Sequence, residues 1–157
     1  SKTAALFTAA CHASSTLAGA KRENIYSVKK YGEFIGISFQ LIDDYLDYVG
    51  SKSSIGKNTG DDFNEKKITM PIIHAMNHAS KNEKLFLTEI FQKNVSKSGD
   101  FERVLEILDR TKSLKFTESQ ALNWSEKAVV SIKELPQSEM RDLLIGCFSE
   151  SFSPPFK

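Results

Sequence analysis

The sequence predicts an all-α fold, and three observations support this prediction. Apolar residues recur at every third or fourth position along most of the chain, which is the spacing of amphipathic helices. No segment shows the strict apolar–polar alternation that is typical of a half-buried strand. The chain has only 4 Pro and 8 Gly in 157 residues, too few for a fold dominated by turns. We therefore expect a single helical domain that covers residues 1–157.

The composition indicates a globular protein and argues against several other classes. Hydrophobic residues make up 40% and charged residues 26% of the chain, a balance that supports a packed core. The 21 Lys and Arg against 20 Asp and Glu give no broad basic surface, so we expect no nucleic-acid partner. Cys11 and Cys147 form neither a disulfide framework nor a CxxC site, which favours a reducing, cytoplasmic location. No apolar run approaches the ~20 residues that span a bilayer.

The first two predicted helices are the clearest. Residues Thr3–Ala20 are rich in Ala and Leu, which are strong helix formers. Residues Ile25–Val49 keep an apolar spacing of three to four over their whole length, so this helix should bury a broad stripe. The pattern then stops at Gly50–Thr69, which holds three Gly, four Lys and two adjacent Asp. We expect a long polar loop there, and a loop of this length is more often functional than idle.

The second half of the chain predicts five further helices. Pro71 suits the first turn of a helix because that position needs no backbone N–H. Pro136 precedes the last helix, which ends before Pro154 and Pro155. The predicted helices are Ile72–Ala79, Glu83–Lys93, Phe101–Arg110, Leu114–Lys133 and Ser138–Ser149.

The strongest chemical signal is the sequence Asp-Asp-Tyr-Leu-Asp at residues 43–47, inside the second predicted helix. Residues three and four apart share a helix face, so Asp47 neighbours both Asp43 and Asp44. Gln40 lies one turn earlier. Three carboxylates on one surface repel each other, and a hard cation such as Mg²⁺ cancels this repulsion while it bridges them to phosphate oxygens. The alternative is an acidic helix face that is turned to solvent.

The polar loop places cations close to this acidic motif. Lys57, Lys66 and Lys67 lie in the loop, and Lys2-Thr3 offers a further ammonium group and a hydroxyl donor. Ammonium groups can hold the outer oxygens of a diphosphate while metal ions neutralise the inner ones. Each lysine taken alone is more simply a solvated surface residue. The diphosphate site is therefore predicted from the combination and not from any one lysine.

A set of short motifs occurs in a fixed order along the first half of the chain: Lys2-Thr3-Ala4, Tyr31-Gly32, Gly36, Phe39-Gln40, the acidic motif 43–48, Gly56-Lys57, Gly60-Asp61-Asp62 and Lys67-Ile68-Thr69-Met70-Pro71. Their order and spacing resemble the C-terminal half of the trans-type polyprenyl diphosphate synthases, of the octaprenyl or solanesyl kind. The resemblance is dense from Lys2 to Ile73 and weak from Asn77 onward.

The resemblance implies an all-α fold, the C-terminal part of the isoprenoid synthase helical bundle. Two Asp-rich motifs face each other across a deep cavity in that bundle. Asp43, Asp44 and Asp47 correspond to the second motif, as ligands of Mg²⁺. The positions that hold or support the allylic diphosphate correspond to Lys2, Thr3, Gln40, Lys57 and Lys67. Asp61 matches a polar loop position whose role stays open.

The activity that the resemblance implies is prenyl transfer in isoprenoid biosynthesis, including the synthesis of quinone side chains. An allylic prenyl diphosphate ionises, the double bond of isopentenyl diphosphate attacks the cation, and a proton is lost. Metal ions stabilise the departing diphosphate, and lysines supplement them. The implied partners are these two substrates, and either a second copy of the chain or the missing N-terminal half.

The chain departs from the family pattern in two respects. The first Asp-rich motif belongs upstream of Lys2, so we expect this chain to be inactive alone. The family usually has Glu-Gly-Lys where this chain has Glu65-Lys66-Lys67, which leaves open which lysine acts. Product length cannot be predicted because the residues that cap the product cavity belong to the upstream half.

Two other functions remain as alternatives. The chain can be a non-catalytic helical subunit or remnant that pairs with a full-length synthase or with a separate N-terminal half. A terpene cyclase relative would also be helical and metal-dependent, but Gly56-Lys57 and the absence of that family's Asn/Ser/Glu metal triad argue against it. His74 and His78 have a spacing that can hold Zn²⁺, but no third ligand is evident.

Overall fold

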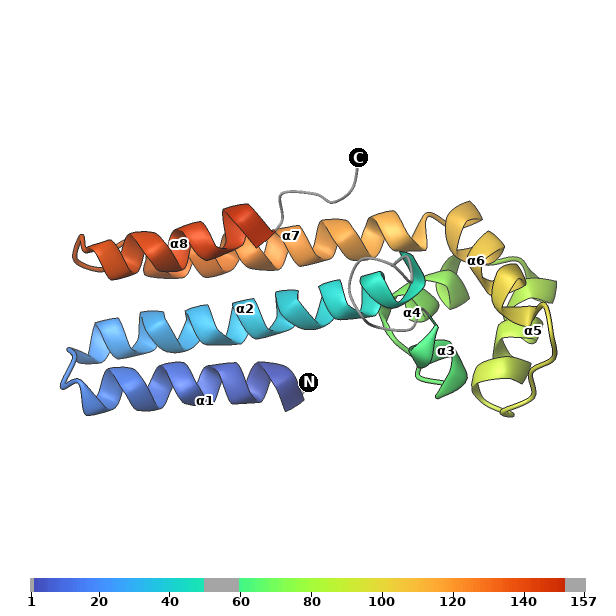
Figure 1. The fold of residues 1–157 in the computed structure, drawn as a ribbon, viewed down its shortest axis with the longest axis horizontal. Coiled ribbons are helices and arrows are strands. Elements are labelled where there is room, and N and C mark those ends of the chain that lie inside the picture. Colours follow the sequence, from blue (N-terminus) through green and yellow to red (C-terminus); the bar gives the residue numbers. More distant parts are fainter. Residues whose placement is uncertain (1, 50–59, 152–157) are drawn as a thin grey trace. The chain divides into compact units, whose positions relative to one another are not determined.

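The computed structural model describes residues 2–49 and 60–151, with side chains as far as residue 146. Every regular element within these residues is an α-helix, which confirms the predicted all-α fold class. The helices are α1 (Lys2–Leu17), α2 (Arg22–Val49), α3 (Asp61–Asn64), α4 (Met70–His78), α5 (Lys81–Phe91), α6 (Asp100–Arg110), α7 (Ser113–Ile132) and α8 (Glu139–Ser151) (Figure 1). In the part of the chain that is described, no helix has the length and apolar character that crossing a membrane requires.

The seven predicted helices are all present, but the sequence missed α3. This four-residue helix lies in the segment that was expected to be a polar loop, so that expectation was wrong for residues 61–64. Asp61 and Asp62 occupy its first turn, where negative charge is favourable. A helix of about one turn shows no apolar period, however, and periodicity could not reveal it. Residues 50–59 of the expected loop lie outside the described residues.

The helices belong to two compact units. One unit contains residues 1–40 and 120–157, and the other contains residues 41–119. The chain enters the second unit within α2 and returns to the first within α7.

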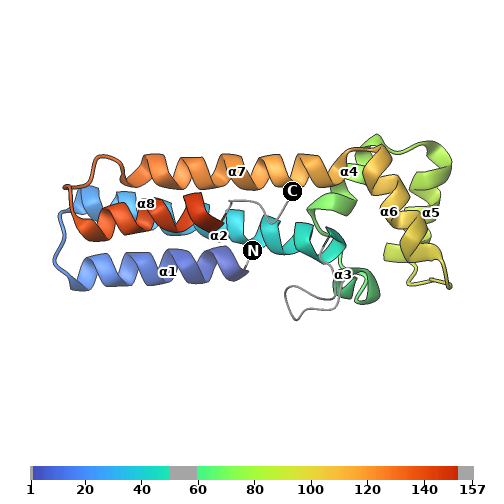
Figure 2. The same cartoon turned by 45° about the horizontal axis from the view of Figure 1, so that its top comes forward.

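The first unit is built on a close, antiparallel contact between α1 and α2 (Figures 1 and 2). A Cβ atom added at Gly32 would lie 2.6 Å from the carbonyl oxygen of Phe7, and one at Gly36 would lie 2.6 Å from Cα of Ala4. Only glycine therefore permits this approach of the two backbones. The Tyr31 hydroxyl donates to the carbonyl of Leu144 at 2.9 Å, which ties α8 to α2.

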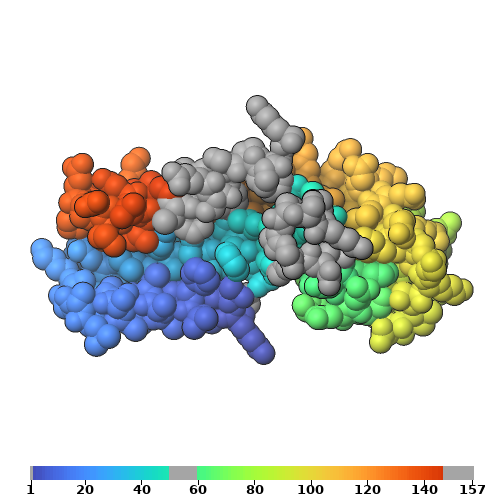
Figure 3. Space-filling view, in the orientation of Figure 1, coloured from blue at the N-terminus to red at the C-terminus, as the bar shows by residue number. Residues whose placement is uncertain are grey.

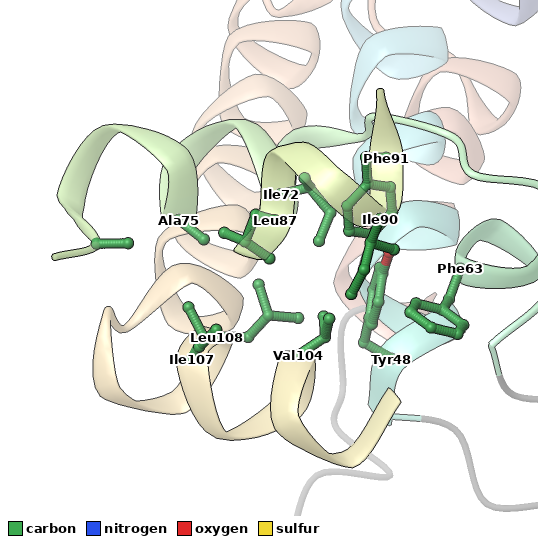
Figure 4. Packing of buried hydrophobic residues seen from close by; sticks show 11 residues of the cluster. Tyr48, Phe63, Ile72, Ala75, Leu87, Ile90, Phe91, Val104, Ile107 and Leu108 are labelled. Atoms are coloured by element: carbon green, nitrogen blue, oxygen red, sulfur yellow. The ribbon is translucent and has the colours of Figure 1, made fainter. Parts of the chain in front are cut away.

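The second unit encloses the larger apolar core (Figure 4). Leu87 of α5 and both Val104 and Leu108 of α6 are fully buried in it. The start of α5 is fixed by a capping box, in which the Ser80 and Glu83 side chains bond to each other's backbone N–H groups. Reciprocal caps of this kind satisfy donors that a helix leaves without partners.

We expect Gly36→Ala to lower the free energy of unfolding by about 1–3 kcal/mol, the usual cost of overpacking a close contact. The added methyl group must displace the Ala4 backbone of α1. Gly146 of α8 is a matched control, since an added Cβ there meets no atom of the described residues within 4 Å. Gly146→Ala should raise the free energy of unfolding by up to about 1 kcal/mol, because Ala forms helices better than Gly. Urea titrations followed by circular dichroism would measure both, and two effects of the same sign would contradict the close contact.

Candidate functional site

The acidic motif occupies the last two turns of α2. Asp44 is buried, with 7% of its surface exposed, and its Oδ2 accepts a long hydrogen bond of 3.5 Å from the N–H of Met70. Asp47 is half-buried and accepts from the N–H groups of Asp61 and Asp62, at 3.2 and 3.0 Å. The motif is therefore not simply an acidic face that is turned to solvent. Two of its carboxylates contact the backbone where α3 and α4 begin.

Negative charge is concentrated around Asp47. Burial raises the pKa of its carboxyl group, the N–H of Asp62 opposes this rise, and the charges of Asp62 and Asp61 add to it. The phenol of Tyr48 has a pKa well above its usual range, chiefly because of burial and then because of the charges of Asp62 and Asp47. A cation placed here would relieve repulsion among these carboxylates.

The donor chemistry of this region fits Mg²⁺, although the described residues do not complete a site. Carboxylate oxygens are the ligands that Mg²⁺ prefers, and the ion usually adds water and phosphate oxygens to one or two of them. Among the residues with described side chains, no three His, Cys, Asp or Glu converge in a way that could hold a metal ion. Asp43, Asp44 and Asp47 would therefore need oxygens from a bound ligand to complete the coordination.

The structure separates the two adjacent lysines. Lys67 Nζ lies 3.1 Å from Oδ1 of Asp62 and 2.7 Å from Oε2 of Glu65, and these hydrogen bonds, that of Glu65 first, raise its pKa. Lys66 turns elsewhere: its Nζ donates to Ser96 at 2.8 Å and lies 4.0 Å from the ring centroid of Phe63. Lys67 is therefore the lysine that lies with the acidic residues.

Backbone geometry explains why Lys66 points away. Its φ angle is +56°, a left-handed conformation that glycine adopts more readily than any residue with a Cβ. The family that the sequence resembles usually has glycine at this position. Lys66 thus takes the conformation that the turn after α3 requires, and its ammonium group lies over the ring of Phe63.

The remaining predicted site residues belong to the other unit, except for Lys57, which lies outside the described residues. Lys2 is the exposed first residue of α1. The Thr3 hydroxyl donates to Oε1 of Gln40 at 2.9 Å, so α1 and α2 bring these two predicted residues into contact. Sequence reasoning missed the role of Asp62, which links Asp47 to Lys67. Its position after Gly60 and Asp61 was the only available signal.

The two histidines pack against each other and against α7. Their rings stack with centroids 4.0 Å apart, and the His74 ring also stacks on Phe116. Nδ1 of His74 lies 3.0 Å from Oγ of Ser113, and Nδ1 of His78 contacts the carbonyl of His74 at 2.9 Å. Burial, and then the charge of His78, lowers the pKa of His74. These contacts give the pair a packing role.

Comparison with known proteins adds an independent line of evidence. The family model described as polyprenyl synthetase matches residues 1–108. The octaprenyl diphosphate synthase of Escherichia coli (strain K12) is 41% identical over 147 residues, which cover 93% of this chain and 45% of that protein. The decaprenyl-diphosphate synthase of Dictyostelium discoideum is 34% identical over 92% of this chain and 30% of its own length. The chain thus spans less than half the length of these curated relatives.

Solved structures give the same result. A decaprenyl diphosphate synthase from Rhodobacter capsulatus superposes with a TM-score of 0.86 and 37% identity, over 93% of this chain and 45% of that one. A polyprenyl synthase from Caulobacter crescentus, complexed with calcium and isoprenyl diphosphate, has a TM-score of 0.85 and 33% identity. The match to the Caulobacter structure covers 92% of this chain and 44% of that one.

The left-handed conformation of Lys66 should determine which substitutions at this position are tolerated. The free energy of unfolding should be about 1 kcal/mol higher for Lys66→Gly than for Lys66→Ala. A residue with a Cβ atom, such as Ala, pays a steric cost at a positive φ angle, whereas Gly does not. Glu106, which is exposed within α6, supplies the control. At this helical position the free energy of unfolding should be about 1 kcal/mol higher for the Ala variant than for the Gly variant. Denaturant titrations of the four variants would show the reversal of order. If the Ala variant is more stable than the Gly variant at both positions, the left-handed conformation of Lys66 is wrong.

Proposed function

The chain belongs to the polyprenyl synthetase family, and on this premise we propose that it is the C-terminal part of a trans-polyprenyl diphosphate synthase domain. Such an enzyme extends an allylic diphosphate with isopentenyl diphosphate in isoprenoid biosynthesis, and the octaprenyl relative favours a long-chain product of the quinone side-chain type. The observation that carries the proposal is the Lys67 ammonium group beside Asp62, within the acidic region that begins at Asp47. An ammonium group beside several carboxylates suits a complex of a divalent cation and a diphosphate, in which the diphosphate supplies the remaining metal ligands.

The relatives support this choice of ligand. The Caulobacter crescentus polyprenyl synthase was solved with calcium and isoprenyl diphosphate, that is, with a divalent cation and a diphosphate. For this chain we propose Mg²⁺, held by Asp43, Asp44 and Asp47. When bound, Mg²⁺ would stabilise negative charge on the departing diphosphate.

The roles of the other residues follow from their chemistry. Lys67 would bind outer diphosphate oxygens as a point charge, and the family resemblance implies the same role for Lys2 and Lys57. Thr3 donates to the amide oxygen of Gln40 at 2.9 Å, and the family resemblance implies that both residues support the allylic diphosphate.

In the reaction the allylic C–O bond breaks and the diphosphate leaves with the electron pair. The double bond of isopentenyl diphosphate then forms the new C–C bond, and loss of a proton restores a double bond. The lysines act by favouring the charge that develops on the leaving group.

Exposed apolar side chains in the first unit suit a missing partner. Helix α1 lies at the surface in Figure 3, and its Leu6 and Leu17 are 70% and 88% exposed. Large apolar side chains that are exposed to this degree are candidates for burial against a partner. We propose that the remaining half of the synthase covers it, as a longer chain, a separate subunit or a second copy. The alternative is a non-catalytic helical subunit that pairs with a full-length synthase or with a separate N-terminal half.

Magnesium binding should depend on pyrophosphate. We expect Mg²⁺ to bind the chain weakly alone and more tightly when inorganic pyrophosphate is present, because the ligand supplies oxygens that the protein lacks. Isothermal titration calorimetry under both conditions would measure the two affinities. Equal Mg²⁺ affinity with and without pyrophosphate would contradict a shared site.

The adjacent lysines provide the matched control for this measurement. Lys67→Ala should weaken pyrophosphate affinity about tenfold or more, since a charged hydrogen bond is worth about 1.5–3 kcal/mol. Lys66→Ala should leave the affinity within about a factor of two, since its ammonium group lies over Phe63 and a mere charge effect is small at an exposed position. Equal losses would mean that the segment acts only as diffuse positive charge.

Prenyl transfer should require the other half of the domain. The lone chain should not elongate an allylic diphosphate, since each missing 1.4 kcal/mol or so of charge stabilisation slows the reaction about tenfold. Adding a separately expressed N-terminal half should restore Mg²⁺-dependent incorporation of labelled isopentenyl diphosphate, and Asp43→Ala should abolish the gain. Steady elongation by the purified chain alone would refute this division, whereas failure of every combination would favour the non-catalytic subunit.

A further inference from the structure

Three successive backbone N–H groups donate hydrogen bonds to a single residue, Asp47. The N–H of Gly60 donates to the carbonyl oxygen of Asp47 at 2.9 Å. The N–H groups of Asp61 and Asp62 donate to its Oδ1 and Oδ2, at 3.2 and 3.0 Å. Successive N–H groups that face one way form an anion-binding concavity. In this protein the concavity is filled by one residue of α2.

The segment needs this partner because it cannot cap itself. The first N–H groups of any helix have no acceptor within the helix, and α3 is only four residues long. Its N-cap is Gly60, which has no side chain and has a φ of +91°. An added Cβ at Gly60 would also lie 3.1 Å from the Phe101 ring. A cap from Gly60 itself is therefore excluded, and the carboxylate of Asp47 takes its place.

Asp62 is hydrogen-bonded both to Asp47 and to Lys67, so it links the position of Lys67 to that of Asp47. Its N–H is bonded to Asp47, its carbonyl oxygen accepts from the N–H of Lys67 at 2.9 Å, and its Oδ1 accepts from Lys67 Nζ at 3.1 Å. The backbone and the side chain of Lys67 are thus both fixed to Asp62. A continuous series of hydrogen bonds joins Asp47, Asp62 and Lys67.

A second, apolar anchor keeps the segment in the fold independently of Asp47. Phe63 is buried, and its ring centroid lies 6.1 Å from that of Phe91 and 5.2 Å from that of Phe101. Figure 4 shows Phe63 beside the ring of Tyr48 in this core. Loss of the Asp47 side chain should therefore loosen residues 60–62 without unfolding the unit.

We propose that Asp47 is a positioning residue, which fixes the backbone of residues 60–62 so that Lys67 is held where it can bind a diphosphate oxygen. This inference rests on the proposed function and assigns Asp47 a role beyond that of a metal ligand. A carboxylate has about four acceptor positions, so two N–H contacts leave room for both roles. The two roles make different predictions for a double-mutant cycle.

The cycle combines Asp47→Ala with Lys67→Ala and measures the affinity for inorganic pyrophosphate in the presence of Mg²⁺. In the natural background, Lys67→Ala should weaken binding about tenfold or more. In the Asp47→Ala background it should weaken binding less than about threefold, because residues that act through one another are not additive. The control cycle replaces Asp47→Ala with Asp43→Ala, for which we expect the two losses to add.

Amide hydrogen exchange supplies a readout that does not depend on binding. The amides of Asp61 and Asp62 should exchange at least about tenfold faster in Asp47→Ala, while the buried core amide of Leu108 should not change. Asp47→Asn keeps one acceptor oxygen and should give intermediate exchange and intermediate coupling to Lys67.

The outcomes separate this inference from the proposed function. If the unmodified chain binds no pyrophosphate with Mg²⁺, the proposed function fails, and exchange at Asp61 and Asp62 still decides whether Asp47 fixes the segment. If binding occurs but the losses add and exchange is unchanged, the positioning role is overturned and the function stands. If the Asp47→Asn variant binds pyrophosphate as weakly as the Asp47→Ala variant, while the amides of Asp61 and Asp62 exchange at the normal rate, Asp47 acts only as a metal ligand.

Discussion

The end of α2 is organised by the need to satisfy backbone N–H groups at the start of the segments that follow. A short helix cannot do this for itself, and a hydrogen bond of this kind contributes about 0.5–1.5 kcal/mol to stability. Asp47 and Asp44 supply acceptors for the backbone of α3 and α4. The acidic motif therefore stabilises the fold before any ligand binds. A carboxylate that is placed for hydrogen bonding is also already in position, at no further entropic cost, when a cation arrives.

Using the same carboxylates to cap helices and to bind a cation brings several negative charges close together. Asp61 and Asp62 donate N–H groups to Asp47, yet their own charges raise its pKa. Lys67 offsets part of this excess by bonding Asp62 and Glu65. A magnesium–diphosphate complex would offer the same neutralisation in another form, with the cation meeting the carboxylates and the anion meeting the lysine. The region is thus suited to a ligand that brings both charges together.

Sequence reasoning succeeded where a physical signal extends over many residues. The length of α2 follows from an apolar period kept over seven turns or so, and the family follows from many motifs in order. It failed where the outcome depends on a single dihedral angle or contact. Lys66 and Lys67 are chemically identical, and the sequence does not reveal that Lys66 has a φ of +56° and lies over Phe63 while Lys67 bonds Asp62. Helix α3 was missed because its cap comes from Asp47, fourteen residues away from the N–H of Asp61.

One helix carries both the glycines that meet α1 and the carboxylates that cap α3. Gly32, Gly36 and the acidic motif 43–47 all lie on α2, where each residue adds about 100° of rotation and about 1.5 Å of rise. Substitutions between Gly36 and Asp43 that keep the helix preserve that phase, although Ser38 and Leu41 in this stretch are buried and Gln40 accepts a hydrogen bond from Thr3. Insertion or deletion of a single residue there would turn the carboxylates by more than a quarter of a revolution from the glycine face. This stretch of α2 is therefore constrained in length as well as in composition.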